Sequence, residues 1–166
     1  MIRSYSWAVA LLLLGPIVQA SETERLALQG LPAEIALFVN LPAGVAAESI
    51  RSEAEALLKG SGLEVQEFLG TEARTALEIV VSSAQAFPAL TGSGGMVEQL
   101  KKLCTTVVET KLSAPVVLKM TKQNSAAEVW STLRFGVMDC DDESMIRQLA
   151  TAQVREFVAA YQLYNP

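Results

Sequence analysis

Hydrophobic and polar positions follow two periods in turn near the start of the chain, and they predict a strand, a helix and a second strand. Residues 35–41 form a compact apolar run that ends at Pro42, which is typical of a buried strand. Residues 50–59 repeat apolar side chains at helical spacing, and Gly60 stops the helix. Residues 63–69 alternate loosely as a second strand. The three elements form a βαβ unit, whose crossover we expect to be right-handed.

The rest of the chain predicts three more strands and two more helices. A strand over 77–83 is followed by a loop over 84–95 and by a helix, with its apolar stripe over 97–108, that ends before Pro115. Two strands over 116–121 and 129–138 come next, joined by a turn at 123–125. The last element is a helix over 146–161. The order β-α-β-β-α-β-β-α predicts an α+β (mixed α/β) single domain. Its mixed sheet should be covered by helices on at least one face.

The first 20 residues have the pattern of a cleaved signal peptide. Arg3 supplies a positive start, an apolar run covers residues 7–18, and small residues end the segment. A retained transmembrane anchor is the alternative. The run is shorter than the roughly 20 residues that cross a bilayer, and Gly15 and Pro16 interrupt it. We therefore expect cleavage.

Cleavage of residues 1–20 would leave one domain in an exported protein. Residues 21–33 form a lead-in segment, and residues 34–166 form the single domain. Ser21 stands where a bacterial lipoprotein would carry its acylated cysteine, so no stable membrane anchor is expected after cleavage. The predicted location is the periplasm or the extracellular space.

Charge narrows the class of partner. Without residues 1–20 the chain keeps 18 acidic and 12 of its 13 basic residues, which is a net charge of −6. Nucleic acid is an unsuitable partner, because lysine and arginine dominate phosphate binding. The same net charge disfavours attraction to an anionic membrane. Aromatic residues make up 6% of the chain, too few for a surface that stacks sugars or bases.

The absence of histidine removes most familiar catalytic chemistry. The chain contains no histidine and two cysteines. This excludes a Ser-His-Asp triad, a Cys-His dyad, a histidine zinc site and a four-thiolate site. Acid–base catalysis would have to use carboxylates, lysine or tyrosine.

Two local patterns resemble ion sites but fit structural roles better. The acidic cluster of Asp139, Asp141, Asp142 and Glu143 lacks the ligand spacing of a calcium loop, and Asp141 or Asp142 instead suits the N-cap of the last helix. Residues 92–95 are glycine-rich but lack the Gly-Lys-Ser/Thr of a phosphate loop. The sequence therefore predicts no metal ion and no cofactor.

The cysteine pair predicts a disulfide. Cys104 and Cys140 are an even pair in a chain expected to be exported. The bond would tie the helix over 97–108 to the end of the fifth strand. The alternative is two unpaired thiols, with Cys104 as a small core residue.

Trp130 and Arg134 are the candidate interface residues. They lie on one face of the strand over 129–138, and both types are typical anchors of protein interfaces. The alternative role for Trp130 is to pack under a helix.

The layout resembles known secreted modules. Residues 35–65 resemble the opening strand-helix-strand of secreted bacterial α/β proteins, among them exported zinc peptidases, whose zinc motif requires histidine. The whole chain resembles the N-terminal domain of the Tol-system propeller protein and the domains of outer-membrane assembly lipoproteins. In those modules a hairpin is followed by a closing helix, as in residues 128–161. The resemblance transfers no functional residue.

These observations favour a binding protein over an enzyme. The leading hypothesis is an exported non-catalytic protein that binds a protein partner, as an accessory factor of the bacterial cell envelope. One alternative is a carboxylate-based secreted hydrolase, which needs two convergent carboxylates in a cleft. The other is a small-ligand carrier, which needs an apolar cavity near residues 84–95.

Overall fold

The computed structural model describes the chain from residue 22 onward, except for residues 43–46, 67–73, 119 and 141. Its elements are α1 (Glu22–Leu28), β1 (Glu34–Asn40), α2 (Ala47–Gly60), β2 (Glu64–Gln66), β3 (Ala76–Gln85), α3 (Gly95–Lys101), β4 (Leu103–Val117), β5 (Asn124–Asp139) and α4 (Glu143–Tyr164). The segment expected to be a signal peptide lies outside the described residues.

The five strands form one mixed sheet in the order β2-β1-β3-β4-β5. β1 lies between β2 and β3 and is parallel to both, while β3, β4 and β5 are antiparallel neighbours. The strand, helix and strand of the expected βαβ unit are β1, α2 and β2, which pair in parallel as predicted. The structure confirms the predicted α+β fold with a mixed sheet.

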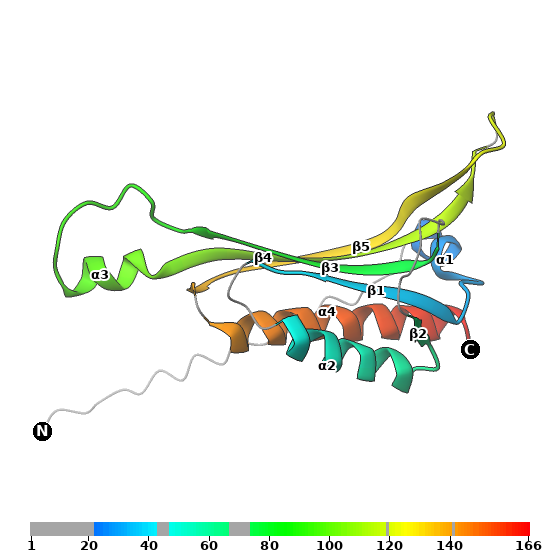
Figure 1. Cartoon of the computed structure of the whole chain (residues 1–166), viewed down its shortest axis with the longest axis horizontal. Coiled ribbons are helices and arrows are strands. Elements are labelled where there is room, and N and C mark those ends of the chain that lie inside the picture. Colours follow the sequence, from blue (N-terminus) through cyan, green and yellow to red (C-terminus); the bar gives the residue numbers. More distant parts are fainter. Residues whose placement is uncertain (1–21, 43–46, 67–73, 119, 141) are drawn as a thin grey trace, which may run out of the picture.

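Helices α2 and α4 lie under the same face of the sheet (Figure 1). α2 turns Ile50, Ala54 and Leu58 inward, and α4 buries an apolar face that includes Val154 and Phe157. These side chains pack against alternate residues of the strands, such as the row formed by Leu77, Ile79 and Val81 on β3. The hydrophobic core is therefore a single layer between this face and the two helices.

The predicted helix over 97–108 is wrong in its second half. α3 ends at Lys101, and β4 begins at Leu103 and continues to Val117. Residues 105–108 are all β-branched, which favours a strand, and burial along β4 alternates with period two. Pairing with other strands decides the conformation of this segment, because residues 104–113 pair with β3 and the whole of β4 pairs with β5. An apolar pattern over so few residues fits either period until these pairings are known.

The lead-in segment packs onto the end of the chain. Leu28 of α1 is fully buried in the core. The Asn165 side chain donates to the Leu28 carbonyl at 2.9 Å and accepts from the Gly30 amide at 2.9 Å. Gly30 has φ 76, a left-handed conformation that glycine adopts without steric cost. Because Leu28 is part of the core cluster, the lead-in segment belongs to the same fold as the rest of the described residues.

A buried polar side chain fixes α4 against the sheet. Gln153 is fully buried, and its amide accepts from the Thr110 hydroxyl at 2.8 Å and donates to the Val108 carbonyl at 2.7 Å. A buried amide without partners would cost a few kcal/mol. Only one position of α4 along β4 satisfies this amide, so the bonds set the register between helix and strand.

The cysteines form the predicted disulfide, although it joins different elements from those expected. Cys104 lies near the start of β4 and Cys140 directly after β5, with their Cα atoms 4.8 Å apart. The Cys140 amide also donates to the Lys102 carbonyl at 2.9 Å. The bond therefore closes the open end of the β4–β5 hairpin, because residue 104 belongs to a strand and not to a helix.

The last helix begins as predicted, because Asp142 is the N-cap of α4 and its carboxylate accepts from the Met145 amide at 3.0 Å. The strand predicted over 116–121 is wrong beyond Val117, where β4 ends. The hairpin turn lies earlier than the predicted 123–125, because the Lys122 amide donates to the Leu118 carbonyl and β5 already begins at Asn124.

We predict that Gln153→Ala lowers the free energy of unfolding by about 2–3 kcal/mol, because it orphans buried partners and leaves a cavity. Gln148→Ala is the matched control, since Gln148 is exposed on the same helix. It should change stability by less than about 0.5 kcal/mol. Chemical denaturation of both variants measures the difference, and equal effects would contradict the role given to Gln153.

We predict that removing the disulfide in a Cys104→Ala/Cys140→Ala variant lowers the free energy of unfolding by about 4 kcal/mol. The cysteines are 36 residues apart, and closing a loop of that size restricts the unfolded chain by this amount in the chain-entropy account. Dithiothreitol should destabilise the wild type in denaturant titrations and leave the double variant unchanged. A reductant effect on the variant would show a different cause.

Candidate functional site

The edge strand β5 carries the strongest candidate surface. β5 is the last strand in the sheet order, and no strand in the described part of the chain pairs with its outer edge. An edge strand offers free backbone N–H and C=O groups that another strand can pair with. Charged residues and proline usually protect such an edge. The middle of β5, residues 131–137, contains a single charged residue, Arg134.

Three apolar side chains line the face of β5 that points away from the helices. Leu133, Phe135 and Val137 are 56%, 74% and 60% exposed, and we call them the outer row. They alternate with residues that face the helix layer, such as Trp130 and Met138, which are buried. Side chains two residues apart share one face of a strand, so the outer row forms a continuous apolar stripe.

The neighbouring strand β4 adds an apolar residue to this stripe and places charged residues at its border. Val107 of β4 lies opposite Phe135 and is partly buried. Next along β4, Glu109 lies opposite Leu133 and pairs with Lys111 at 3.0 Å. The hydrogen bond to Glu109 raises the pKa of Lys111, so this lysine stays charged at neutral pH. The stripe therefore has an apolar centre and an ionic border, as protein interfaces have.

The two interface residues predicted from the sequence face the helix layer. Trp130 is buried, with its ring 5.4 Å from that of Phe157 on α4. It takes the core role that the sequence also allowed. Arg134 is on the same face but nearer the surface, and its guanidinium pairs with Glu156 at 3.0 Å. Arg134 is therefore held at the rim beside the outer row.

The sequence contained the outer row without marking it. Over residues 129–137 the apolar side chains Val129, Leu133, Phe135 and Val137 alternate with Trp130, Thr132, Arg134 and Gly136. Alternation assigns residues to two faces but does not say which face meets a helix. Here the more apolar face is the exposed one, and no local signal in the strand marks it as such.

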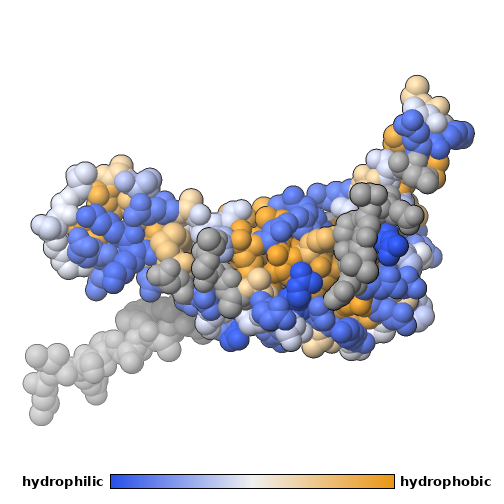
Figure 2. Space-filling view, in the orientation of Figure 1, coloured by the Kyte–Doolittle hydropathy of each residue, from blue (hydrophilic) through white to orange (hydrophobic). Residues whose placement is uncertain are grey.

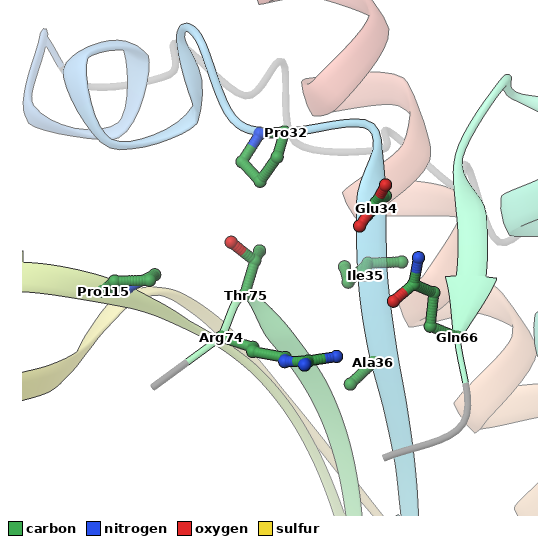
Figure 3. Close-up of a pocket in the computed structure, with 8 residues that line it drawn as sticks. All are labelled: Pro32, Glu34, Ile35, Ala36, Gln66, Arg74, Thr75 and Pro115. Carbon is green, nitrogen blue, oxygen red and sulfur yellow. The ribbon is translucent and has the colours of Figure 1, made fainter. Parts of the chain in front are cut away.

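A separate cavity lies where β1 and β3 begin (Figure 3), and its volume is about 370 Å³. The residues that line it are Pro32, Glu34, Ile35, Ala36, Gln66, Arg74, Thr75 and Pro115. The Thr75 side chain turns toward the space between Pro32 and Pro115, but its oxygen is covered and has no hydrogen-bond partner. A covered hydroxyl offers a ligand no accessible donor.

The cavity does not match the one expected for a small-ligand carrier. It lies at the start of β3, whereas the loop over 84–95 follows the other end of that strand. A hollow of about 580 Å³ beside α3 is nearer to that loop. It is lined by Lys101, Lys102, Asp139, Cys140 and Asp142, so four of its five lining residues carry charge. Of its two carboxylates, Asp142 already caps α4.

The described residues contain neither a metal-ligand cluster nor a membrane-spanning helix. In these residues no three His, Cys, Asp or Glu side chains come together as a metal site. Among the described helices, none is both long and apolar enough to cross a bilayer. Asp141, one member of the acidic cluster, lies outside the described residues.

Comparison with known proteins leaves the family open. No family model and no curated protein matches the chain. Among solved structures, a minor lipoprotein from Acinetobacter baumannii aligns over 80% of this chain and 92% of its own, at 10% identity and TM-score 0.36. Rare lipoprotein B from Shewanella oneidensis aligns over 77% and 96%, at 10% identity and TM-score 0.33. An uncharacterized lipoprotein B from Nitrosomonas europaea aligns over 78% and 85%, at 13% identity and TM-score 0.34. Alignments this loose carry no information on function.

We predict that Phe135→Thr leaves the free energy of unfolding within about 0.5 kcal/mol of the wild type, because the ring is mostly exposed and threonine also suits a strand. The same variant should bind less of the dye ANS, which reports exposed apolar surface. Phe157→Ala is the contrasting variant, since that ring is fully buried, and it should cost about 3–5 kcal/mol. A large loss of stability in Phe135→Thr would show that the outer row is part of the core.

Proposed function

We propose that this protein is exported and binds a protein partner through the outer row and the free edge of β5. The observation that carries the proposal is the exposure of Leu133, Phe135 and Val137 on an unpaired edge strand. Contiguous exposed apolar side chains of this kind mark interaction sites more often than chance surface.

The geometry suits a partner that adds a strand. Backbone groups along the edge of β5 supply hydrogen bonds, and the outer row supplies side-chain contacts on one face. Each apolar Å² removed from water contributes roughly 25 cal/mol. The partner we infer is therefore a protein with an exposed strand that carries apolar side chains on alternate positions.

Arg134 has a directing role in this proposal. Its guanidinium sits at the rim of β5 and already pairs with Glu156 on α4. A rim charge contributes more to orientation and association rate than to affinity. Arg134 would favour a partner with an acidic side chain beside its strand.

Two features support export, and a third supports a non-catalytic role. Residues 1–20 have the charge and hydrophobicity of a cleavable leader. The disulfide between Cys104 and Cys140 is a type of bond that persists in oxidising compartments. The absence of histidine leaves little catalytic chemistry for an exported enzyme to use. An accessory role in the bacterial cell envelope fits all three.

We predict that benzoylphenylalanine at position 135 crosslinks to one defined protein when the chain is produced and exported in its own cells. The ring replaces an exposed phenylalanine on the outer row, so the photoprobe lies in the proposed contact. Position 163 is the control, because Leu163 is an equally exposed apolar residue on α4, away from β5. The same adduct from both positions would contradict a site on β5.

The captured protein is then tested in purified form. Phe135→Thr should weaken its affinity roughly tenfold or more, as expected at the centre of an interface. Leu163→Thr should leave affinity unchanged within about twofold. Equal affinity of the wild type and Phe135→Thr would overturn the proposed function.

A further inference from the structure

The β4–β5 hairpin extends well beyond the rest of the sheet. The pairing of β3 with β4 ends at Ser113, whereas β4 and β5 stay paired as far as Val117 and Asn124. The last part of the hairpin is therefore a two-stranded ribbon, which rises from the body of the molecule in Figure 1. Side chains at its tip have no sheet or helix layer to pack against.

The tip carries apolar side chains away from the core. Val117 and Leu118 are 62% and 46% exposed, and Met120 is 98% exposed. Figure 2 shows this end of the hairpin standing clear of the main surface. The Leu118 amide donates to the Gln123 carbonyl at 3.0 Å, and the Lys122 amide donates to the Leu118 carbonyl at 2.8 Å. The backbone of the turn is thus closed, and the side chains project outward.

The charge of this segment opposes that of the whole chain. No acidic residue occurs between Glu109 and Glu128, while Lys111, Lys119 and Lys122 are all positive. Lys111 is paired with Glu109 near the body of the sheet, and Lys122 is exposed at the turn. The tip is therefore apolar and cationic in a protein whose net charge is −5.

We propose that the tip of the β4–β5 hairpin docks into the interface of a bilayer that contains anionic lipids. Met120, Leu118 and Val117 enter the boundary between headgroups and acyl chains, and Lys122 contacts the anionic headgroups. This arrangement matches the apolar-plus-basic pattern of segments that lie in membrane interfaces. It is a reversible contact and needs no anchor in the chain.

The size of the tip favours a bilayer over a protein. A stable protein interface buries about 800 Å² on each partner. The tip presents three apolar side chains at a turn, where both strands end, so unlike the middle of β5 it offers a partner no length of strand edge to pair with. A bilayer sets no such requirement, because a narrow apolar tip can enter it without a complementary surface.

Net charge does not prevent this contact. Interactions between exposed charges are screened beyond about 8 Å at physiological ionic strength. The tip projects away from the acidic body, so the local charge decides its approach to a surface. The expectation that anionic membranes are disfavoured holds for the molecule as an average and not for this hairpin.

The test is cosedimentation of residues 21–166 with vesicles of phosphatidylcholine, with or without 25% phosphatidylglycerol. We expect binding to the anionic vesicles that falls as salt rises. Met120→Ser and Lys122→Gln should each lower the partition coefficient about fivefold. The matched control is Met96→Ser, because Met96 is 77% exposed on α3 and not on the hairpin. It should change binding less than twofold.

Several outcomes would overturn the proposal. These are no binding of the wild type to anionic vesicles, equal binding to neutral vesicles, or equal losses from Met120→Ser and Met96→Ser. A Met120→Ser variant that keeps vesicle binding but loses a protein partner would assign the tip to a protein instead. Circular dichroism checks that each exposed variant is folded. Phe135→Thr should leave vesicle binding unchanged, so this test and that of the β5 interface fail separately.

Discussion

The fold depends on how α4 is held against β4. Gln153 places a fully buried amide between helix and sheet and bonds it to the Thr110 hydroxyl and the Val108 carbonyl. Apolar packing determines which face of this 22-residue helix meets the sheet but provides no directional bonds along its axis. The directional bonds allow one position, and that position brings Phe157 under Trp130 and Glu156 beside Arg134. The arrangement of both faces of β5 follows from it.

The helices α2 and α4 cover one face of the sheet and leave apolar side chains exposed elsewhere on the strands. α2 and α4 account for the inner face, and the long β4 and β5 strands continue past the area that these helices can shield. On the β4–β5 hairpin, large apolar side chains then remain exposed in two separate places, on the middle of β5 and at the hairpin tip. A compact sandwich of this length would have buried both. The two proposed contacts are therefore consequences of the same one-sided architecture.

The sequence predicted the parts of the fold that local signals control. The βαβ unit was read correctly because Pro42 and Gly60 punctuate clear changes of period. Residues 103–108 were assigned to a helix because their strand conformation comes from pairing with β3 and β5, which a local pattern does not contain. The cysteine pair was predicted from composition and compartment, even though the elements it joins were not. The outer row could not be placed, because the inner face of β5 is known only once α4 is in position.

The hydrogen bonds of the Asn165 side chain have a consequence for the proposed export of this protein. Its side chain holds Leu28 and Gly30, so the first described helix is fastened by a residue 137 positions later. α4 supplies five of the 19 residues of the buried core cluster, and among the described helices it would be the last to leave a channel that threads the chain from its amino terminus. In the export that we propose, the core could therefore not close before the carboxyl end had left the channel, and the chain would cross it unfolded.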